Sequence, residues 1–277
     1  FGALISPTDP IAVLGILKET STPKSLETTI AGESLFNDGV GVVVFAVILS
    51  LATGTAHSNI DASGIFLLFI EEALGGIVFG LVLGYIFYRL LKSIDSYAVE
   101  ILLTLALVMG GYSLAHTLHV SGPLAMVVAG LFLGNHGKTF AMSEATHKQL
   151  FSFWELIDEF LNAVLFVLIG IQILVISFSF NYLLIGIIII PIILCVRFIA
   201  VSFPLIIIGD GANLVNGASK VMTWCGLRGG ISIALALSIP DVPEKPLILA
   251  VTYIVVAFSI LVQGLSSKKL VNHILEA

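Results

Sequence analysis

Charged residues are scarce in this chain of 277 residues. They make up 11% of the sequence, against about 25% in a typical soluble domain, while hydrophobic residues make up 58%. The few lysines and arginines are spread thinly and form no basic patch, which excludes nucleic acid as a partner. Together with a mean hydropathy of +1.10, this composition predicts an integral protein of the lipid bilayer.

Cysteine is rarer still, with two residues, Cys195 and Cys225, in different apolar segments. Neither has a histidine or a second cysteine at metal-ligand spacing, which argues against both a disulfide framework and a zinc site. We therefore expect both side chains to fill apolar space. No bound cofactor is expected either.

Long apolar runs make up most of the chain. There are nine of them, and most are near or above the roughly 20 residues that a helix needs to cross a bilayer. They lie at about 1–17, 29–52, 64–91, 97–118, 120–135, 151–176, 182–208, 219–239 and 246–266. The predicted fold class is all-α, a multi-pass membrane protein with about nine transmembrane spans. Residues 18–28 are expected to form a loop, and residues 138–160 a polar, then amphipathic segment at the membrane interface.

The basic residues of the connecting loops indicate how the spans are oriented. Nine of them fall on one side and only Lys245 on the other, and positively charged loops face the cytoplasm. The nine are Lys18, Lys24, Arg89, Lys92, Lys138, Lys148, Lys220, Lys268 and Lys269. We therefore expect a cytoplasmic C-terminus, and a first span that crosses the cell membrane from outside to inside.

The first apolar run is interrupted by Ser-Pro-Thr-Asp-Pro at positions 6–10. Two prolines three residues apart do not fit one regular helix, because each removes a backbone hydrogen bond and clashes with the preceding turn. We predict two half-helices with an irregular break at Thr8 and Asp9. Broken helices at membrane depth are tolerated where they line a cavity, and they often mark a transporter's binding site. Asp9 could also cap a half-helix N-terminus, where a carboxylate is stabilised.

The second apolar run carries two acidic residues, Glu33 and Asp38, although a charge at the centre of a membrane helix costs roughly 2.5–3.5 kcal/mol. At about 100° per residue, Ser34 and Asp38 share one helix face, while Glu33 and Asn37 share the adjacent face. One helix thus offers a carboxylate beside a hydroxyl and a second carboxylate beside an amide. Both carboxylates are candidate functional groups, because charges at this depth are rarely kept without a function.

Four charges are expected at one depth of the membrane. Counted from the neighbouring loops at about 1.5 Å per residue, Asp9 and Asp38 both lie about 14–15 Å from the cytoplasmic surface. Arg197 and Arg228 reach a similar depth in the seventh and eighth runs. The eighth run is interrupted by glycines and crosses in the direction opposite to the first. Two broken helices of opposite direction are typical of a transporter built from inverted repeats.

Three motifs carry a resemblance to a known family. They are Ser-Pro-Thr-Asp-Pro-Ile-Ala-Val from position 6, Gly-Glu-Ser-Leu-Phe-Asn-Asp-Gly from position 32 and Gly-Leu-Arg-Gly-Gly from position 226, with Arg197 between the last two. In this combination the chain resembles the Na⁺/H⁺ exchanger family of monovalent cation:proton antiporters, of the NhaP/NHE type. The resemblance covers essentially the whole chain. It implies a thirteen-helix fold, and we expect this chain to hold the last nine helices of a longer protein.

The resemblance also implies an ion site. Asp38 would bind the transported cation and the proton in turn, with Ser34, Thr8 and Asp9 close by. Asp38 and Asp9 are the carboxylates that would contact the monovalent cation. An electroneutral exchange of one cation for one proton follows from a site with a single titrating carboxylate on this helix, where Asn37 stands before Asp38.

Further residues would support that site. In the family pattern Glu33 and Asn37 would be held by Arg197, and Arg228 would stabilise the second broken helix. A homodimer is implied as well. The expected organisation is a core transport domain at 1–52, dimerisation and scaffold helices with an interfacial linker at 53–176, and the second core repeat at 177–277.

Other functions fit the residues less well. The sequence does not separate Na⁺ from Li⁺ or K⁺, so a K⁺/H⁺ antiporter of the same fold is the first alternative. Two membrane aspartates could form an intramembrane protease, but its Tyr-Asp and Gly-x-Gly-Asp patterns are absent at Asp9 and Asp38. An ion channel would need a filter of carbonyls or charge rings, and no such repeat is visible. We therefore expect a transporter and not an enzyme.

Overall fold

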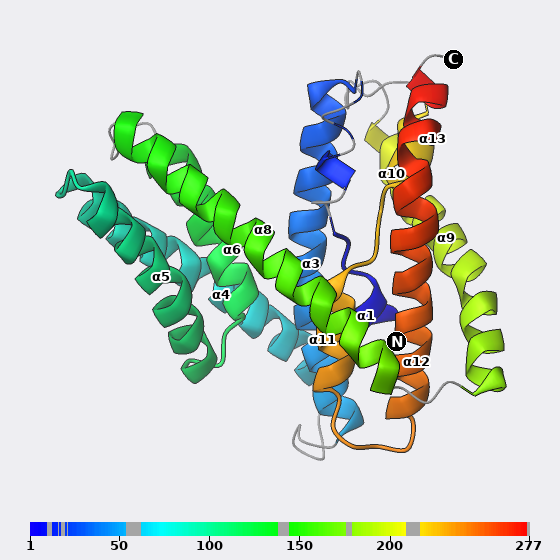
Figure 1. The fold of residues 1–277 in the computed structure, drawn as a ribbon. Helices are drawn as coiled ribbons and strands as arrows, with labels where there is room; N and C mark the ends of the chain where they lie inside the picture. The colour runs from blue at the N-terminus through cyan, green and yellow to red at the C-terminus, as the bar shows by residue number, and fades with distance from the viewer. Residues whose placement is uncertain are drawn as a thin grey trace. The chain divides into compact units, whose positions relative to one another are not determined.

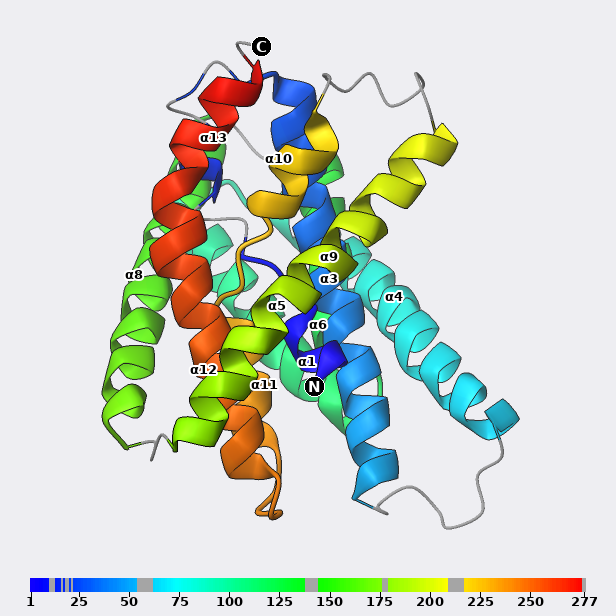
Figure 2. The same ribbon diagram turned by 90° about the vertical axis from the view of Figure 1, so that its right-hand side faces the viewer.

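The computed structural model describes residues 1–9, 13–15, 17, 20, 22–53, 62–137, 144–175, 179–208 and 217–275. Within these ranges all regular structure is helical, which agrees with the all-α fold class (Figures 1 and 2). The helices are α1 (Gly2–Ile5), α3 (Lys24–Ala52), α4 (Ala62–Lys92), α5 (Tyr97–Thr117), α6 (Gly122–Phe132), η1 (Leu133–Gly137), α8 (Glu144–Val175), α9 (Phe180–Ile208), α10 (Ala218–Trp224), α11 (Gly230–Ser238), α12 (Lys245–Phe258), η3 (Ser259–Gly264) and α13 (Leu265–Leu275).

The helices follow the apolar runs of the sequence, because a backbone in lipid must satisfy its own hydrogen bonds. Five helices within the described ranges are long and apolar enough to cross a membrane. They are Lys24–Ala52, Leu67–Lys92, Tyr97–Thr117, Phe180–Ile207 and Lys245–Ile274. The number of nine spans goes beyond these five and stays a prediction.

One predicted boundary is wrong. Helix α3 begins at Lys24, so residues 24–28, expected as part of a loop, form its first turns. The polar side chains there are compatible with a helix, and the Thr28 hydroxyl donates to the Lys24 carbonyl one turn earlier. Helix α8 begins at Glu144, so residues 144–160 of the expected interfacial segment are helical, and their place at the membrane interface stays a prediction. Residues 138–143 lie outside the described ranges.

The chain forms two compact units, divided inside α3 and inside α8. Unit 1 comprises residues 1–41 and 168–277, and unit 2 comprises residues 42–167. In unit 1, α9 packs against α10 and α12, while α11 packs against α12 and α1. The core of unit 1 consists of Val13, Leu17, Leu26, Ile30, Val201, Ala218, Val221, Met222, Cys225, Leu227 and Val271. Cys225 thus fills apolar space as expected, whereas Cys195 is exposed on α9.

Unit 2 is held together by close packing of α4 against α6. Gly76, Gly80 and Gly84 lie one turn apart on α4. They face small residues that are one turn apart from the N-cap of α6 onward, namely Ser121, Ala125 and Ala129. A Cβ added at Gly80 would lie 2.9 Å from the Cα of Ala125. Small residues therefore let the two backbones approach, as is common between membrane helices.

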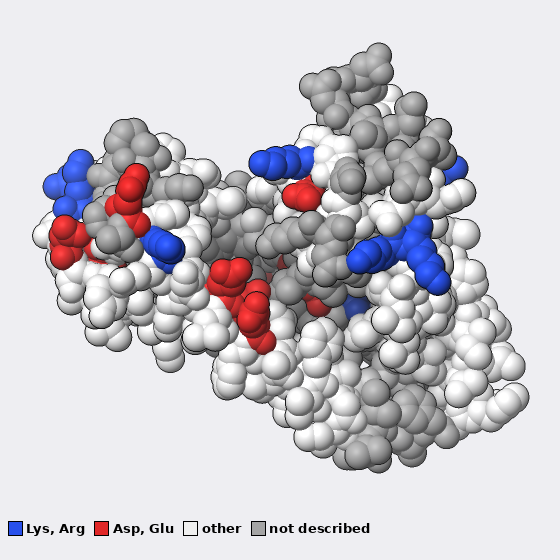
Figure 3. Space-filling view, turned by 45° about the horizontal axis from the view of Figure 1, so that its top comes forward, with Lys and Arg blue, Asp and Glu red and all other residues white. Residues whose placement is uncertain are grey.

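The outer surfaces of the helices are largely apolar. On α9, Phe180 and Ile206 are 79% and 78% exposed, respectively. Figure 3 shows one face of the molecule, on which charged side chains are few and most of the visible surface is uncharged. Helix α9 also contains Pro191 and Pro204, which membrane helices tolerate better than soluble ones do. We conclude that these faces are suited to lipid contact.

We expect Gly80→Ala to destabilise unit 2 by about 1–3 kcal/mol, the usual range for overpacking a tight contact. The matched control is Gly110→Ala on α5, where nothing lies within 4 Å of an added Cβ. That variant should be neutral, or more stable by about 0.5–1 kcal/mol, because alanine favours the helix. Thermal melting of the detergent-solubilised variants measures both. Equal melting temperatures for the two variants would contradict the close α4–α6 packing.

Candidate functional site

Two helices of unit 1 are interrupted, and their breaks cross. Helix α1 ends at Ile5 and residues 6–9 are not helical, while residues 225–229 separate α10 from α11. The Asp9 N–H donates to the Leu227 carbonyl at 2.8 Å, which joins the two breaks. In both ribbon views the dark-blue N-terminal segment and the orange connection from α10 to α11 meet near the middle of α3 (Figures 1 and 2). Both interruptions were expected from proline and glycine in the sequence.

Thr8 connects the first break to α3. Its backbone N–H donates to Asp38 Oδ1 at 3.0 Å, and its hydroxyl donates to the Ser34 hydroxyl at 3.0 Å. Thr8 and Ser34 are each 2% exposed. The structure therefore brings together Asp38, Ser34 and Thr8, with Ser34 and Asp38 on one face of α3 as their spacing predicts.

Asn37 also contacts the first break. Its side-chain amide donates to the Ser6 carbonyl at 2.6 Å and, at 3.4 Å, to the Thr8 hydroxyl. The family pattern implied that Asn37 would be held by Arg197, and the structure gives it other partners. The Ser6 carbonyl, just after α1, can accept from this amide because the break leaves it without a partner in its own helix.

Glu33 pairs with Arg197 as the resemblance implied. Both terminal nitrogens of the guanidinium donate to the two carboxylate oxygens of Glu33, and Nη2 also donates to the Met222 carbonyl at 3.3 Å. The Arg197 side chain is 8% exposed and that of Glu33 27%. An added Cβ at Gly226 would lie 2.6 Å from Arg197 Nε, so only glycine leaves room for the guanidinium there. A bidentate pair of this kind fixes α9 against α3.

Arg228 interacts with backbone instead of with a carboxylate. Its guanidinium donates to the carbonyls of Ser6 and Pro7, the latter at 3.0 Å, and the side chain is buried. Its own backbone N–H donates to the Ser259 hydroxyl at 2.8 Å. The resemblance implied that Arg228 stabilises the second broken helix, whereas its guanidinium contacts carbonyls of the first.

Asp9 lies against the start of α11. An added Cβ at Gly229, the residue before that helix, would lie 2.7 Å from both Cβ and Oδ2 of Asp9. Free N–H groups and the helix dipole favour a carboxylate at such an end. The Asp9 side chain thus lies beside the N-terminus of α11, and its capping role stays a prediction.

Two contributors were not predicted from the sequence, Ser259 and Gln263. Gln263 donates to the Trp224 carbonyl at 3.0 Å and accepts from the Ser259 hydroxyl at 2.9 Å, and Ser259 accepts from Arg228 N–H. The signal was available, since both are polar residues four apart within an apolar run. Because both are uncharged, neither is among the charges at membrane depth that mark the site in the sequence.

The site leaves one carboxylate without a counter-ion. Asp38 forms no ion pair with any described residue, since Arg197 is engaged by Glu33 and Arg228 by carbonyl oxygens. No group of three or more His, Cys, Asp or Glu in the described ranges is placed to hold a metal ion. Any ion at Asp38 would therefore meet one carboxylate surrounded by hydroxyl and backbone groups.

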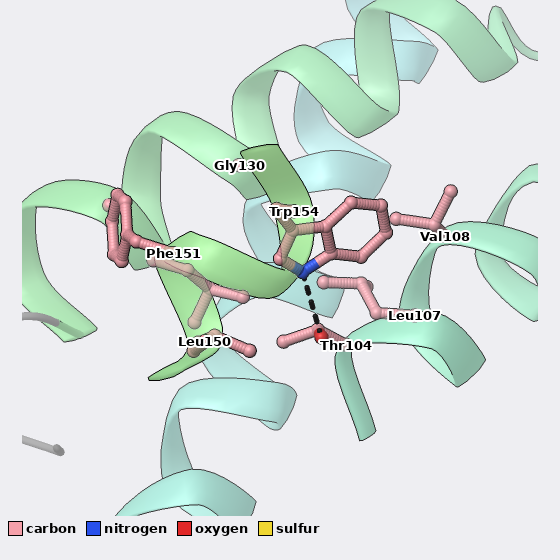
Figure 4. Close-up of a pocket in the computed structure, with 9 residues that line it drawn as sticks. Thr104, Leu107, Val108, Gly130, Leu150, Phe151 and Trp154 are labelled. Atoms are coloured by element: carbon pink, nitrogen blue, oxygen red, sulfur yellow. Dashed lines mark hydrogen bonds between the residues drawn. The ribbon is translucent and has the colours of Figure 1, made fainter. Parts of the chain in front are cut away.

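Unit 2 contains a cavity of a different character. It has a volume of about 320 Å³ and is lined by apolar residues of α5, α6, η1 and α8 (Figure 4). Its polar contact is a hydrogen bond of 3.0 Å from Trp154 Nε1 to the Thr104 hydroxyl. No acidic or basic residue lines it. The charged residues described above lie instead at the crossing in unit 1.

Comparisons with known proteins agree with this arrangement. Residues 1–273 match the family described as sodium/hydrogen exchanger, transmembrane. A Na⁺/H⁺ antiporter NhaP of Pseudomonas aeruginosa is 52% identical over 278 residues, which cover 99% of this chain and 65% of that protein. The Na⁺/H⁺ antiporter NhaH of Halobacillus dabanensis is 38% identical over 284 residues, with 99% and 68% covered. The chain thus spans about two thirds of the length of these relatives.

A solved structure shows the same fold. The sodium proton antiporter MjNhaP1 from Methanocaldococcus jannaschii superimposes with a TM-score of 0.76 at 24% identity. The match covers 99% of this chain and 68% of that structure. The two crossed breaks described above thus belong to a fold that an antiporter is known to adopt.

We expect Arg197→Met to lower the free energy of unfolding by about 3 kcal/mol, because it leaves the Glu33 carboxylate without its counter-ion. The lower end of the usual range applies, since Glu33 is 27% exposed and regains some hydration. Adding Glu33→Gln to the same variant should recover much of the loss. Melting curves of the single and double variants in detergent provide the measurement. If the single variant melts like the unmodified protein, the pair contributes nothing to stability.

Proposed function

Because the chain belongs to the sodium/hydrogen exchanger family, we propose that it exchanges Na⁺ for H⁺ across the membrane, with Asp38 as the group that binds either ion. Its relatives are antiporters and not enzymes. The observation that carries the assignment of Asp38 is its position at the crossing, bonded by Thr8 N–H and without a counter-ion among the described residues. We assign Ser34 and Thr8 to the same site as neutral oxygen ligands.

Exchange at Asp38 follows from competition for one carboxylate. Desolvation favours the neutral, protonated form of a carboxylate, whereas a bound cation favours its charged form. The proton and the cation therefore exclude each other. Each crossing then carries either a cation or a proton. The apparent affinity for the cation falls as the pH falls, because protons occupy the same group. Alternating access would come from movement of a core domain past the dimerisation helices.

Na⁺ is the cation that we propose. The relatives reported above are named as Na⁺/H⁺ antiporters, which favours Na⁺ over K⁺, while a hydroxyl and carboxylate site alone would admit either. We further propose a homodimer in the cell membrane with a cytoplasmic C-terminus. The orientation rests on the loop charges, of which nine of ten fall on one side.

Asp38→Asn should abolish exchange in proteoliposomes and leave a folded protein, because the side chain keeps its shape and loses the group that titrates. The matched control is Asp241→Asn, the same substitution at a fully exposed residue that pairs with Lys245. That control should exchange at the unmodified rate. Na⁺-driven proton movement, followed with a pH-sensitive dye, distinguishes the two. Exchange by Asp38→Asn at a near-normal rate would refute the assignment.

We also propose that exchange is electroneutral. In this proposal Asp38 alone alternates between the proton and the cation, because Glu33 is paired with Arg197 and Asp9 lies against the start of α11. One carboxylate that alternates between one proton and one monovalent cation carries the same charge in both directions. The stoichiometry is then one to one.

A membrane potential should therefore leave the exchange equilibrium unchanged. One net charge per cycle would be worth about 2.3 kcal/mol per 100 mV, which shifts the Na⁺ level at equilibrium visibly. The potential is clamped with valinomycin and K⁺ in vesicles at fixed pH and Na⁺ gradients, after K⁺ itself has been tested as a substrate. If the Na⁺ level follows the clamp, a second proton site exists and Asp9 becomes the first residue to test.

A further inference from the structure

Two neutral side chains on the last long helix lie beneath the second break. Ser259 and Gln263 begin and nearly end η3, a wider π-type turn between α12 and α13. They are 0% and 3% exposed, respectively. Single π turns inside α-helices often occur at functional sites, because they turn side chains away from the regular helix face.

These two side chains satisfy the backbone groups that the break sets free. Helix α10 ends at Trp224, whose carbonyl accepts from Gln263 Nε2 at 3.0 Å. On the other side of the break, Arg228 N–H donates to Ser259 Oγ at 2.8 Å. The Ser259 hydroxyl in turn donates to Gln263 Oε1 at 2.9 Å, so one connected pair bridges residues 224 to 228. A buried backbone group without such a partner would be strongly destabilising.

The bridge leads to Asp38 through backbone contacts. It fixes Leu227 and Arg228, and these hold the first break through the Asp9 N–H bond and the guanidinium contacts with the Ser6 and Pro7 carbonyls. The next residue, Thr8, donates its N–H to Asp38. Each link in this path is a hydrogen bond or a peptide bond between residues of unit 1.

We propose that Ser259 and Gln263 are positioning residues of the ion site, which set its affinity for the cation by holding the two breaks in register. The inference rests on the function proposed above for Asp38. Neither side chain is assigned as a ligand of the ion. Loss of either loosens the bond from Thr8 N–H to Asp38 Oδ1, and with it the placement of the carboxylate that binds the cation.

Three other charged groups act on Asp38, and none of them is substituted in the variants below. They are Asp9 from the first break, Glu33 from its own helix and Arg228 from the second break. Since none of them is changed in the variants below, a shift in the ion balance is attributable to the register of the breaks. Removal of one buried hydrogen bond corresponds to roughly a fivefold change in an equilibrium constant.

The test is Ser259→Ala in the full-length protein in proteoliposomes, with Na⁺ as the cation. We expect the KM for Na⁺ to rise about fivefold and the pH for half-maximal exchange to move upward, because the proton competes more effectively. Ser259→Thr, which retains the hydroxyl, should restore both values. Gln263→Met, which keeps the volume and removes both hydrogen bonds, should act in the same direction as Ser259→Ala.

The matched control is Thr252→Val on α12. This removes an equally buried hydroxyl that donates to Ile248 of its own helix and does not contact the break. A lower maximal rate or a lower yield, with KM and the pH profile unchanged in Ser259→Ala, shows a purely structural role and overturns the proposal. A shift of equal size in the KM or the pH profile of Thr252→Val also overturns the proposal. Should Ser259→Ala not fold, Ser259→Cys replaces it, since the thiol keeps the volume and weakens the hydrogen bond. Absence of Na⁺-driven exchange in the unmodified protein would instead refute the proposed function.

Discussion

A backbone that leaves helical geometry inside a membrane must find new partners for its N–H and C=O groups, because no water is at hand. The two breaks of unit 1 meet this demand jointly. The first receives the Arg228 guanidinium on its carbonyls and gives its N–H groups to Asp38 and Leu227. The second is satisfied by side chains of η3. The two breaks also satisfy each other, because the first donates to the Leu227 carbonyl and accepts from the Arg228 guanidinium.

This demand also explains how the charges are distributed. Of the two arginines at the crossing, one neutralises Glu33 and the other binds backbone oxygens. The Asp9 carboxylate lies at the start of α11. Asp38 forms no ion pair with any described residue, and the function proposed above assigns ion exchange to it. The chemistry of the site is thus a result of how the fold satisfies its own backbone.

The sequence predicts the parts of this site that depend on spacing along the chain. Two prolines three apart predict the first break. The spacing of four residues on α3 predicts that Ser34 and Asp38 share one face and that Glu33 and Asn37 share the adjacent one. The contacts of Asn37 could not be derived in this way. Its amide can donate to a carbonyl through the nitrogen or accept from a guanidinium through the oxygen, and the choice depends on distances in the folded structure. Ser259 and Gln263 escaped for a related reason: their partners lie 31 and 39 positions away, and no charge marks them. The start of α3 lies earlier than the sequence predicted, because polar residues can continue a helix beyond its apolar part.

Three glycines border the crossing, and each faces a different partner at less than ordinary contact distance. An added Cβ would lie 2.6 Å from Arg197 at position 226, 2.7 Å from Asp9 at position 229 and 3.0 Å from the Ser6 hydroxyl at position 41. The polar side chains of the site can in principle be exchanged for others of similar shape. An added Cβ at position 226 or 229 would require the Arg197 or the Asp9 side chain to move, whereas at position 41 a shift of a few tenths of an ångström by the Ser6 hydroxyl would make room. The crossing therefore leaves more freedom to its polar side chains than to the glycines at 226 and 229, where the second break itself comes within contact distance of a charged group.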